Sequence, residues 1–214
     1  MHKLVVSSIV FGFASFLGAT AAEAPSSYQN DFEKAAVGPV PEDMMVLDGG
    51  FGIAEAGGNK YLELPGSPLE TYGVIFGPSA ASGQSVQARI RGTGQGRRFP
   101  VFGIGLNGIA GYRLRVSPAK KALEICKGDD VVTSVNFIWE SGSWTVLRLE
   151  LAKVKEGEFI VRGKAWKDGG KEPADWTVQS TVTTEVPVGR PSLWGSPYAG
   201  TPIQFDDLRV EPAR

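Results

Sequence analysis

Apolar residues recur at every second position along much of this chain, and this period of two constrains the fold more than any other feature. In the segment 85–91 apolar side chains alternate with polar ones, and 111–116 and 144–151 repeat the pattern. Such alternation is typical of half-buried β-strands, whereas apolar residues of a helix recur every three or four positions. No segment shows a convincing helical period, so we expect an all-β protein.

Turn signals containing glycine separate these alternating segments. Asn107-Gly108 and Asp168-Gly169 suit the positive φ angles of tight hairpins. Short strands divided by such turns predict an antiparallel sandwich, and their number favours a two-sheet jelly roll over a seven-stranded immunoglobulin-type domain. We expect strands at 28–33, 44–48, 51–55, 60–64, 72–76, 85–91, 99–106, 111–116, 121–126, 131–137, 144–151, 158–166, 175–182, 192–195 and 203–210.

The N-terminal segment predicts a signal peptide. A short basic start precedes an apolar run at 4–17, and small residues follow it. A run of 14 residues is too short to cross about 30 Å of hydrocarbon, so we expect no stable membrane insertion. We instead expect a secreted or periplasmic protein, after cleavage near Ala21 or Ala22. The predicted organisation is a signal peptide at 1–22, a flexible leader at 23–29 and one jelly-roll domain at 30–212.

The residues that remain after cleavage restrict the chemistry. The only histidine, His2, leaves with the predicted signal peptide, which excludes Ser-His-Asp and Cys-His nucleophile systems and histidine-ligated zinc or iron. Cys126 is the only cysteine, so no intrachain disulfide can form, and we expect it to be a small buried hydrophobe. A formal charge of −1 provides no global field that would recruit nucleic acid or an anionic membrane.

Four stretches carry a resemblance to a known superfamily. They are Asn30-Asp31-Phe32-Glu33, the segment 144–151, the segment 159–177 and Phe205-Asp206-Asp207-Leu208. Together they resemble the secreted concanavalin A-like (laminin G-like) jelly-roll domains, over nearly all of 30–212. The resemblance implies a jelly roll with a concave face that is often used for glycans. Because that superfamily also contains glycosidases, lyases and adhesive modules, the resemblance does not choose among these functions.

Catalytic groups are hard to find in the sequence. Glycoside hydrolases need two carboxylates about 5 Å apart for retention, or further apart for inversion. The resemblance implies an alternating acidic run for this purpose, and the chain has none. Tyr112 beside Arg113 leaves open a lyase with a tyrosine base. We therefore expect a non-catalytic module that recognises extracellular carbohydrate. One alternative is a hydrolase or lyase, and another is a structural or assembly domain with a protein partner.

Arginines occupy outward positions of several predicted strands. The predicted ligand-binding arginines are Arg89, Arg91, Arg113, Arg115 and Arg148. Guanidinium groups bind carboxylates and sulfates through paired hydrogen bonds, so a groove for an anionic polysaccharide is one interpretation. The other is a solvated sheet face with ordinary cross-strand pairs, such as Arg148 with Glu124 or Glu150.

Aromatic residues supply a second set of candidates. Trp139, Trp194 and Tyr198 lie among Ser, Gly and Pro residues, as exposed loop residues do. An exposed ring can stack on the C–H face of a sugar, so these three are the aromatic residues we expect at a ligand. The alternative is burial, which is more common for large aromatics.

The closing segment predicts a bulge and a candidate metal site. Apolar parity switches across Asp206-Asp207, and a β-bulge there would reconcile both halves. The resemblance implies that an acidic pair in the closing strand can hold a structural calcium together with the opening strand, here Asp31 or Glu33. Calcium prefers six to eight oxygen ligands, which backbone carbonyls could complete. The alternative is that the aspartates bind backbone groups or an arginine.

Overall fold

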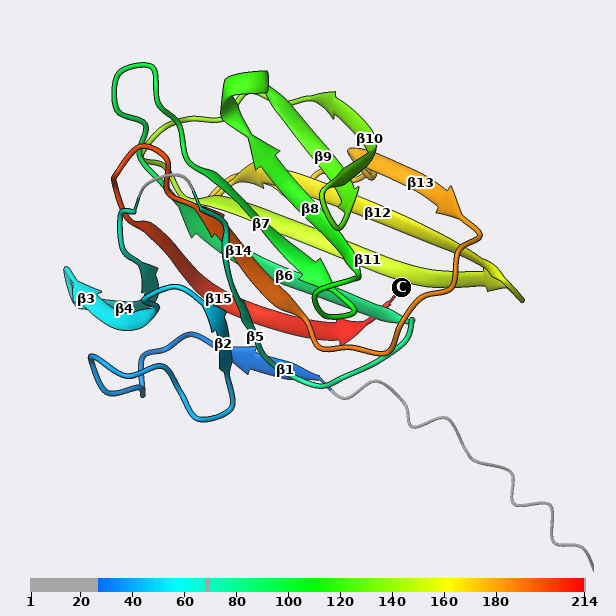
Figure 1. The fold of residues 1–214 in the computed structure, drawn as a ribbon, viewed down its shortest axis with the longest axis horizontal. Helices are drawn as coiled ribbons and strands as arrows, with labels where there is room; N and C mark the ends of the chain where they lie inside the picture. The colour runs from blue at the N-terminus through cyan, green and yellow to red at the C-terminus, as the bar shows by residue number, and fades with distance from the viewer. Residues whose placement is uncertain (1–26, 68–69, 214) are drawn as a thin grey trace, which may run out of the picture.

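Two antiparallel β-sheets lie face to face in this protein, in a computed structural model that describes residues 27–67 and 70–213 (Figure 1). In Figure 1, strands β7 and β8 cross in front of β6 and β11, which belong to the other sheet. The predicted signal peptide and residues 23–26 of the predicted leader lie outside the described residues.

The first sheet, called sheet A here, has the strand order β13-β12-β11-β6-β15-β4-β3, and β1 also pairs with β15. Its strands are β1 (Tyr28–Asn30), β3 (Gly52–Ala56), β4 (Asn59–Leu64), β6 (Gln84–Arg91), β11 (Thr145–Lys155), β12 (Glu158–Lys167), β13 (Val178–Val182) and β15 (Ile203–Pro212). The last strand in the sequence, β15, therefore lies inside the sheet, between β6 and β4.

The second sheet, called sheet B here, has the strand order β10-β9-β8-β7-β14-β5-β2. Its strands are β2 (Met45–Asp48), β5 (Tyr72–Ile75), β7 (Val101–Leu106), β8 (Tyr112–Ser117), β9 (Ala122–Lys127), β10 (Asp130–Asn136) and β14 (Ser192–Ser196). Strand β14 is again an inner strand, between β7 and β5.

The core lies between the sheets and follows the alternation of the sequence. In β6, Val86, Ala88 and Ile90 are fully buried, and in β8 Leu114 and Val116 face the same interior. The intervening polar residues lie on the outer faces, because successive side chains of a strand point to opposite sides. The predicted all-β, two-sheet antiparallel jelly-roll sandwich is confirmed.

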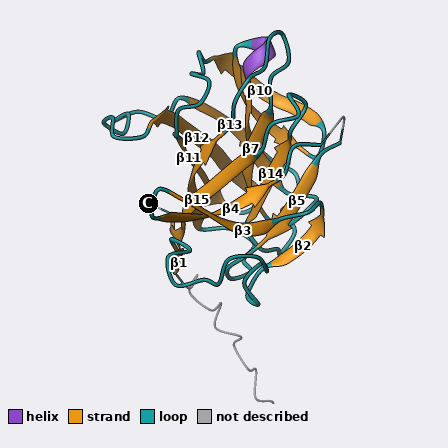
Figure 2. Cartoon of the chain, turned by 90° about the vertical axis from the view of Figure 1, so that its left-hand side faces the viewer, coloured by secondary structure: helices purple, strands orange, loops and turns teal. Residues whose placement is uncertain are grey.

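Strands occur at all the predicted positions, with ends that differ by a few residues. The predicted strand at 175–182 begins only at Val178, whereas β11 continues to Lys155. The described residues also contain one short 3-10 helix, Pro118–Lys120, drawn in purple in Figure 2. No helix in the described part of the chain is long and apolar enough to cross a membrane.

The predicted bulge at the closing aspartates is present. The register between β15 and β6 shifts between Asp206 and Arg209, and Asp207 has a φ of 49°. The extra residue turns Leu208 and Val210 back toward the core, as Phe205 is before the bulge. The same shift leaves the side chains of Asp206 and Asp207 beside β6, where the outer face of sheet A carries its arginines.

Candidate functional site

The predicted basic face does not form one surface, because its arginines belong to different sheets. Arg89 and Arg91 lie on β6 and Arg148 on β11, so all three are on the outer face of sheet A. Arg113 and Arg115 lie on β8, on the outer face of sheet B. The expectation of a single groove across consecutive strands is therefore wrong, since the core separates the two groups.

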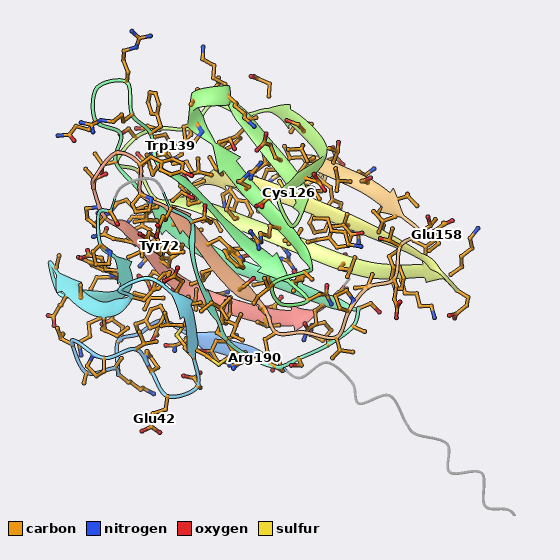
Figure 3. All side chains as sticks on the ribbon, viewed as in Figure 1. Glu42, Tyr72, Cys126, Trp139, Glu158 and Arg190 are labelled. Carbon is orange, nitrogen blue, oxygen red and sulfur yellow. The ribbon has the colours of Figure 1, made fainter. Side chains whose placement is uncertain are left out.

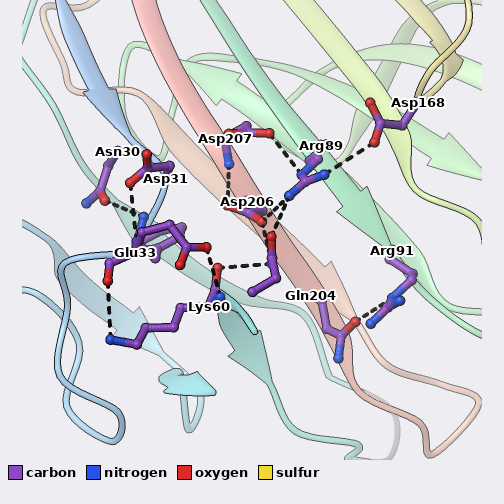
Figure 4. Close-up of polar contacts among 12 residues, drawn as sticks. Asn30, Asp31, Glu33, Lys60, Arg89, Arg91, Asp168, Gln204, Asp206 and Asp207 are labelled. Carbon is purple, nitrogen blue, oxygen red and sulfur yellow. Dashed lines mark hydrogen bonds and ion pairs between the residues drawn. The ribbon is translucent and has the colours of Figure 1, made fainter. Parts of the chain in front are cut away.

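On sheet A, Arg89 is surrounded by carboxylates (Figure 4). Its Nη2 lies 2.7 Å from Asp206, its Nε 3.0 Å from Asp207 and its Nη1 3.3 Å from Asp168. Burial alone would lower the pKa of Arg89, but the hydrogen bonds and negative charges of Asp206, Asp207 and Asp168 together outweigh this and raise it. Arg89 is thus neutralised within the protein and offers little to an anionic ligand.

The other two arginines of sheet A are also engaged. Arg91 donates to Gln204 over 2.6 Å, and Arg91 and Arg89 both lie 4.8 Å from the ring centre of Trp144. Arg148 is 6% exposed, and its ion-pair partners are Glu172 at 3.8 Å and Glu211 at 3.5 Å.

The predicted cross-strand partners of Arg148 were incorrect. Glu150 pairs with Arg162, and Glu124 lies on sheet B with Arg115. The carboxylates that Arg148 does meet come from a loop and from the end of β15, positions that a strand pattern cannot pair.

The carboxylates predicted to hold calcium do not converge on one point. They are Asp31, Glu33, Asp206 and Asp207. The two closing aspartates bind Arg89, while Glu33 accepts a hydrogen bond of 3.0 Å from the backbone N–H of Lys60 (Figure 4). Across residues 27–67 and 70–213, no group of three or more potential metal-ligating side chains is found. The arginine alternative describes this corner of the structure better than the calcium site does.

A cavity of about 320 Å³ lies on the outer face of sheet B. Its lining comes from β7, β8, β9 and β14 and from the loops that flank them. The lining includes Phe99, Arg113, Arg115, Asp129, Trp194 and Tyr198. Four of the eight predicted ligand-binding residues are therefore brought together here, although they are far apart in the sequence.

Glycines in the middle of sheet B make room for Arg113 and Trp194. Gly105 of β7 lies between Arg113 and Ser192, and a Cβ at Gly105 would be 2.5 Å from the Ser192 hydroxyl and 3.3 Å from Arg113 Cγ. Gly73 of β5 pairs with Trp194, and a Cβ there would be 2.8 Å from the indole ring. Because these glycines have no side chains, Arg113 and Trp194 can lie low over the sheet.

Arg113 and Trp194 contact each other directly across β7. The guanidinium carbon of Arg113 lies 3.4 Å from the ring centre of Trp194, and the indole N–H donates to Ser192 Oγ over 2.8 Å. Stacking of a guanidinium on an indole face is favourable and fixes the direction of the cation. Trp194 is therefore a support for Arg113 in this structure, rather than a ring left bare for a sugar.

Arg113 has no anionic partner in the described part of the chain. Its Nη2 donates to the Ile109 carbonyl over 3.1 Å, and its Nε is buried without a hydrogen-bond acceptor. Burial lowers the pKa of Arg113 because the charge is partly removed from water, and the charge of Asp129 opposes this only in part. A partly desolvated cation that faces a cavity is a suitable group for binding an anion.

Arg115 differs from its neighbour because it is already paired. Glu124 accepts from Arg115 at 2.9 Å, from Ser117 at 2.6 Å and from Lys120 at 3.2 Å. Burial would raise the pKa of Glu124, but these donors outweigh it and lower the pKa. Two cations thus share one carboxylate beside the cavity.

The aromatic candidates separate into two groups. Tyr198 is 36% exposed and lines the cavity, as Trp194 does. Trp139 instead packs edge-on against the core residue Phe102, with ring centres 6.0 Å apart, and its indole N–H is buried (Figure 3). Trp139 lies in a loop, as expected, but its ring is only partly exposed because it packs against the core.

The catalytic groups named from the sequence do not lie in the cavity. Tyr112 points into the core, where it is 1% exposed and its hydroxyl lies 3.0 Å from Thr184 Oγ1, so it cannot share the cavity with Arg113. Asp129 is the only carboxylate among the described lining residues. Cys126 is fully buried, as predicted, and burial raises the pKa of its thiol, which keeps it protonated and unreactive (Figure 3).

Sequence reasoning missed Phe99, Asp129 and the glycines beneath the cavity. A signal for the glycines was present, because Gly103 and Gly105 occupy the outward positions of β7, next to the outward arginines of β8. An alternating strand without outward side chains, beside one with long outward side chains, indicates a hollow in the sheet surface.

Comparisons with known proteins identify the fold. No protein-family model matches the sequence, and a search of curated proteins found no match. Among solved structures, the carbohydrate-binding module CBM66 from Bacillus subtilis is similar, with a TM-score of 0.54 and 13% identity over 79% of this chain and 95% of that one. The carbohydrate recognition domain of Emp47p has a TM-score of 0.55 and 11% identity over 92% and 100% of the two chains.

A larger enzyme contains a similar unit. The xylan β-1,4-xylosidase from Bacillus halodurans C-125 has a TM-score of 0.58 and 14% identity, covering 86% of this chain. This chain spans only 38% of the xylosidase. At these identities the likeness establishes a shared jelly-roll β-sandwich, which agrees with the resemblance noted from the sequence.

Proposed function

We propose that this protein is a secreted, non-catalytic module of the concanavalin A-like type that recognises extracellular carbohydrate in the cavity on sheet B. The observation that carries the proposal is the convergence of Arg113, Trp194 and Tyr198 on one cavity. Small-ligand sites combine apolar or aromatic walls with a few directed polar groups, and this cavity has both.

The comparisons support the class of ligand. Two of the similar structures are named as a carbohydrate-binding module and a carbohydrate recognition domain. The matches cover 95% of the first of these and all of the second, and 79% and 92% of this chain. The proposal extends to anionic polysaccharides, because the cavity contains an arginine without a carboxylate partner.

Binding can be tested with the chain that begins after the predicted cleavage site. A thermal-shift screen would use neutral xylan and dextran and acidic alginate and polygalacturonate, and the incubated samples would be checked for new reducing ends and for unsaturated ends. We expect a higher melting temperature with at least one polysaccharide and no product, because a ligand that binds only the folded state stabilises it.

A variant pair assigns the binding to the cavity. Tyr198→Ala removes an exposed ring from the wall and is expected to weaken binding at least several-fold, whereas Val188→Ala shortens a side chain that is 72% exposed and does not line the cavity. Equal loss in both variants, or none in either, would count against this cavity. New sugar ends would favour the hydrolase or lyase, and a copurifying protein with no sugar binding would favour the assembly domain.

The proposed location has its own test. Expression of the full chain in a bacterial host, followed by fractionation and mass spectrometry, is expected to give a periplasmic or secreted protein cleaved after Ala21 or Ala22. An uncleaved protein in the cytoplasm would contradict the export proposal without affecting the carbohydrate site.

A further inference from the structure

We infer that the cavity binds a single oxyanion of an acidic sugar, a carboxylate or a sulfate ester, and that Arg113 is the residue that binds it. This inference rests on the proposed function and adds to it the number of anionic groups that the cavity binds and the residue that binds them.

The first argument is the balance of charge around the cavity. Arg113, Arg115 and Lys120 are the cations of its lining. Glu124 neutralises part of this charge because it binds both Arg115 and Lys120. Asp129 supplies the other carboxylate, which leaves one positive charge in excess. A site with one uncompensated cation is matched to one anionic group, and not to a densely charged polyanion.

The second argument is the position of the cation. The arginines of sheet A that were expected at a ligand are tied to other groups, Arg89 and Arg148 to carboxylates and Arg91 to Gln204. Arg113 differs from them because its guanidinium stacks on an aromatic ring and its one hydrogen bond goes to the backbone carbonyl of Ile109. Since the ring does not consume the hydrogen bonds of the guanidinium, N–H groups remain for an incoming oxyanion.

The third argument is preorganisation. Trp194 is held by its hydrogen bond to Ser192 and by the space above Gly73, and it in turn holds the guanidinium of Arg113. A long arginine side chain otherwise loses rotamer freedom when it binds, which weakens binding. Trp194 is therefore a positioning residue, and Arg113 is the residue expected to contact the ligand.

The size of the cavity limits the rest of the ligand. A volume of about 320 Å³ is at the small end of the range for small-molecule sites. Tyr198 and Phe99 supply aromatic walls, and the hydroxyls of Thr71 and Ser196, which lie 2.7 Å apart, supply polar groups. The cavity therefore suits one charged sugar unit with its immediate neighbour.

The test compares each acidic glycan with a neutral form of the same backbone by isothermal titration calorimetry. The carboxylate arm uses alginate and polygalacturonate oligosaccharides and their carboxyl-reduced forms, and the sulfate arm uses κ-carrageenan oligosaccharides and their desulfated forms. We expect at least one acidic form to bind about 10-fold or more tightly than its neutral form, since hydrogen bonds to charged groups are strong. The arm that shows the difference identifies the oxyanion.

Variants connect this preference to Arg113. Arg113→Gln is expected to abolish the preference for the acidic form, and Arg113→Lys, which keeps the charge but loses the planar group, to retain only part of it. Arg209→Gln removes the same charge from the opposite sheet and is expected to leave the preference unchanged. Melting temperatures of the variants show whether they fold. If Arg113→Gln does not fold, the preference of Arg113→Lys for the acidic form tests the role of Arg113.

The number of charges is tested by salt. With one ion pair, we expect the affinity for the acidic form to fall less than 10-fold between 50 and 500 mM NaCl, because few screened contacts are lost. A steeper loss would overturn the single-anion inference. Equal binding of acidic and neutral forms would also overturn it while leaving carbohydrate recognition intact, and a failure of every oligosaccharide to bind would overturn both.

Discussion

At the scale of single residues, whether an arginine is paired with a carboxylate depends on its neighbours rather than on its place in a strand. Arg113 and Arg115 are two positions apart on one face of β8, yet Arg115 shares Glu124 with Lys120 and Arg113 has no carboxylate. Glu124 lies on the adjacent strand directly opposite Arg115, which explains why only one of the two arginines is neutralised.

Glu124→Gln is expected to destabilise the protein at pH 7 by roughly 1–3 kcal/mol, because a buried charged acceptor with three donors is lost. The pKa of Glu124 is lowered in the folded state, so its contribution is present above the unfolded value, near 4.5, and is lost as the pH falls through the folded pKa. The stability difference between wild type and variant should therefore shrink below pH 4.5. Urea unfolding from pH 3 to pH 7 measures it.

Glu55→Gln, at an exposed position of β3, provides the control for this experiment. We expect it to change the stability much less than Glu124→Gln at pH 7. A stability difference for Glu124→Gln that stays constant down to pH 3 would contradict the assignment of the donors.

Sequence analysis predicted the orientation of several candidate residues but could not identify their partners. The outward direction of Arg113 follows from alternation, and the context of Tyr198 among Ser, Gly and Pro indicates a loop. The carboxylates that bind Arg89 are Asp168 and the bulged pair in β15, more than 75 residues away along the chain. Local periodicity carries no information about such distant contacts, so the predicted basic face seemed less neutralised than it is.

At the scale of elements, the bulge in β15 and the arginine of β6 form one structural unit. Asp206 is 1% exposed, accepts hydrogen bonds from Arg89 and Asn59, and also accepts from the backbone N–H of Asp207. The bulge thus joins the two central strands of sheet A through side chains at the point where their backbone register shifts.

Arg89→Gln is expected to lower the free energy of unfolding by roughly 3 kcal/mol, because it leaves the buried charge of Asp206 without its cationic partner. Adding Asp206→Asn should recover part of this loss by removing that charge. Denaturant unfolding of the two single variants and the double variant gives the coupling. Lys167→Gln removes one partner of an ion pair between the exposed side chains of Lys167 and Glu140, and should change the stability far less. Additive losses of stability for Arg89→Gln and Asp206→Asn would contradict the coupling between these two residues.

Gly73→Ala tests how the elements of sheet B create the cavity. The added Cβ would lie 2.8 Å from the indole of Trp194, so the ring must move and its contact with Arg113 should be lost. We expect a changed near-UV circular dichroism spectrum and a destabilisation of about 1–3 kcal/mol. Gly50→Ala adds the same methyl group at an ordinary contact distance of 3.9 Å and should leave the spectrum unchanged. An unchanged spectrum for Gly73→Ala would refute the described packing.

At the scale of the whole molecule, the last two strands of the sequence occupy inner positions of the two sheets. β14 lies between β7 and β5, and β15 lies between β6 and β4 and also pairs with β1. The alternation of the sequence predicted that these segments are strands, but not which strands they join. Pairing of β6 with β15 connects residues more than 100 positions apart, and no local pattern specifies such a pair.

A chain that ends at residue 202 lacks β15 and is expected not to fold. Without β15, the apolar faces of β6 and β4 lose Phe205, Leu208 and Val210, which are all buried in the core. We expect no cooperative thermal transition and rapid proteolysis, measured by calorimetry and limited trypsin digestion. A chain that ends at residue 212 keeps every strand and should fold, and a folded product from the shorter chain would contradict the central role of β15.

The inner position of these late strands also determines when the protein can fold. A ribosome adds about 5–20 residues per second, and the two sheets stay incomplete until β14 and β15, at residues 192–212, have been added. We therefore expect the nascent chain to lack its native sheets until these strands have been made. A polypeptide in that state is a suitable substrate for a translocation channel that accepts only extended chains, and this agrees with the proposed export of the protein.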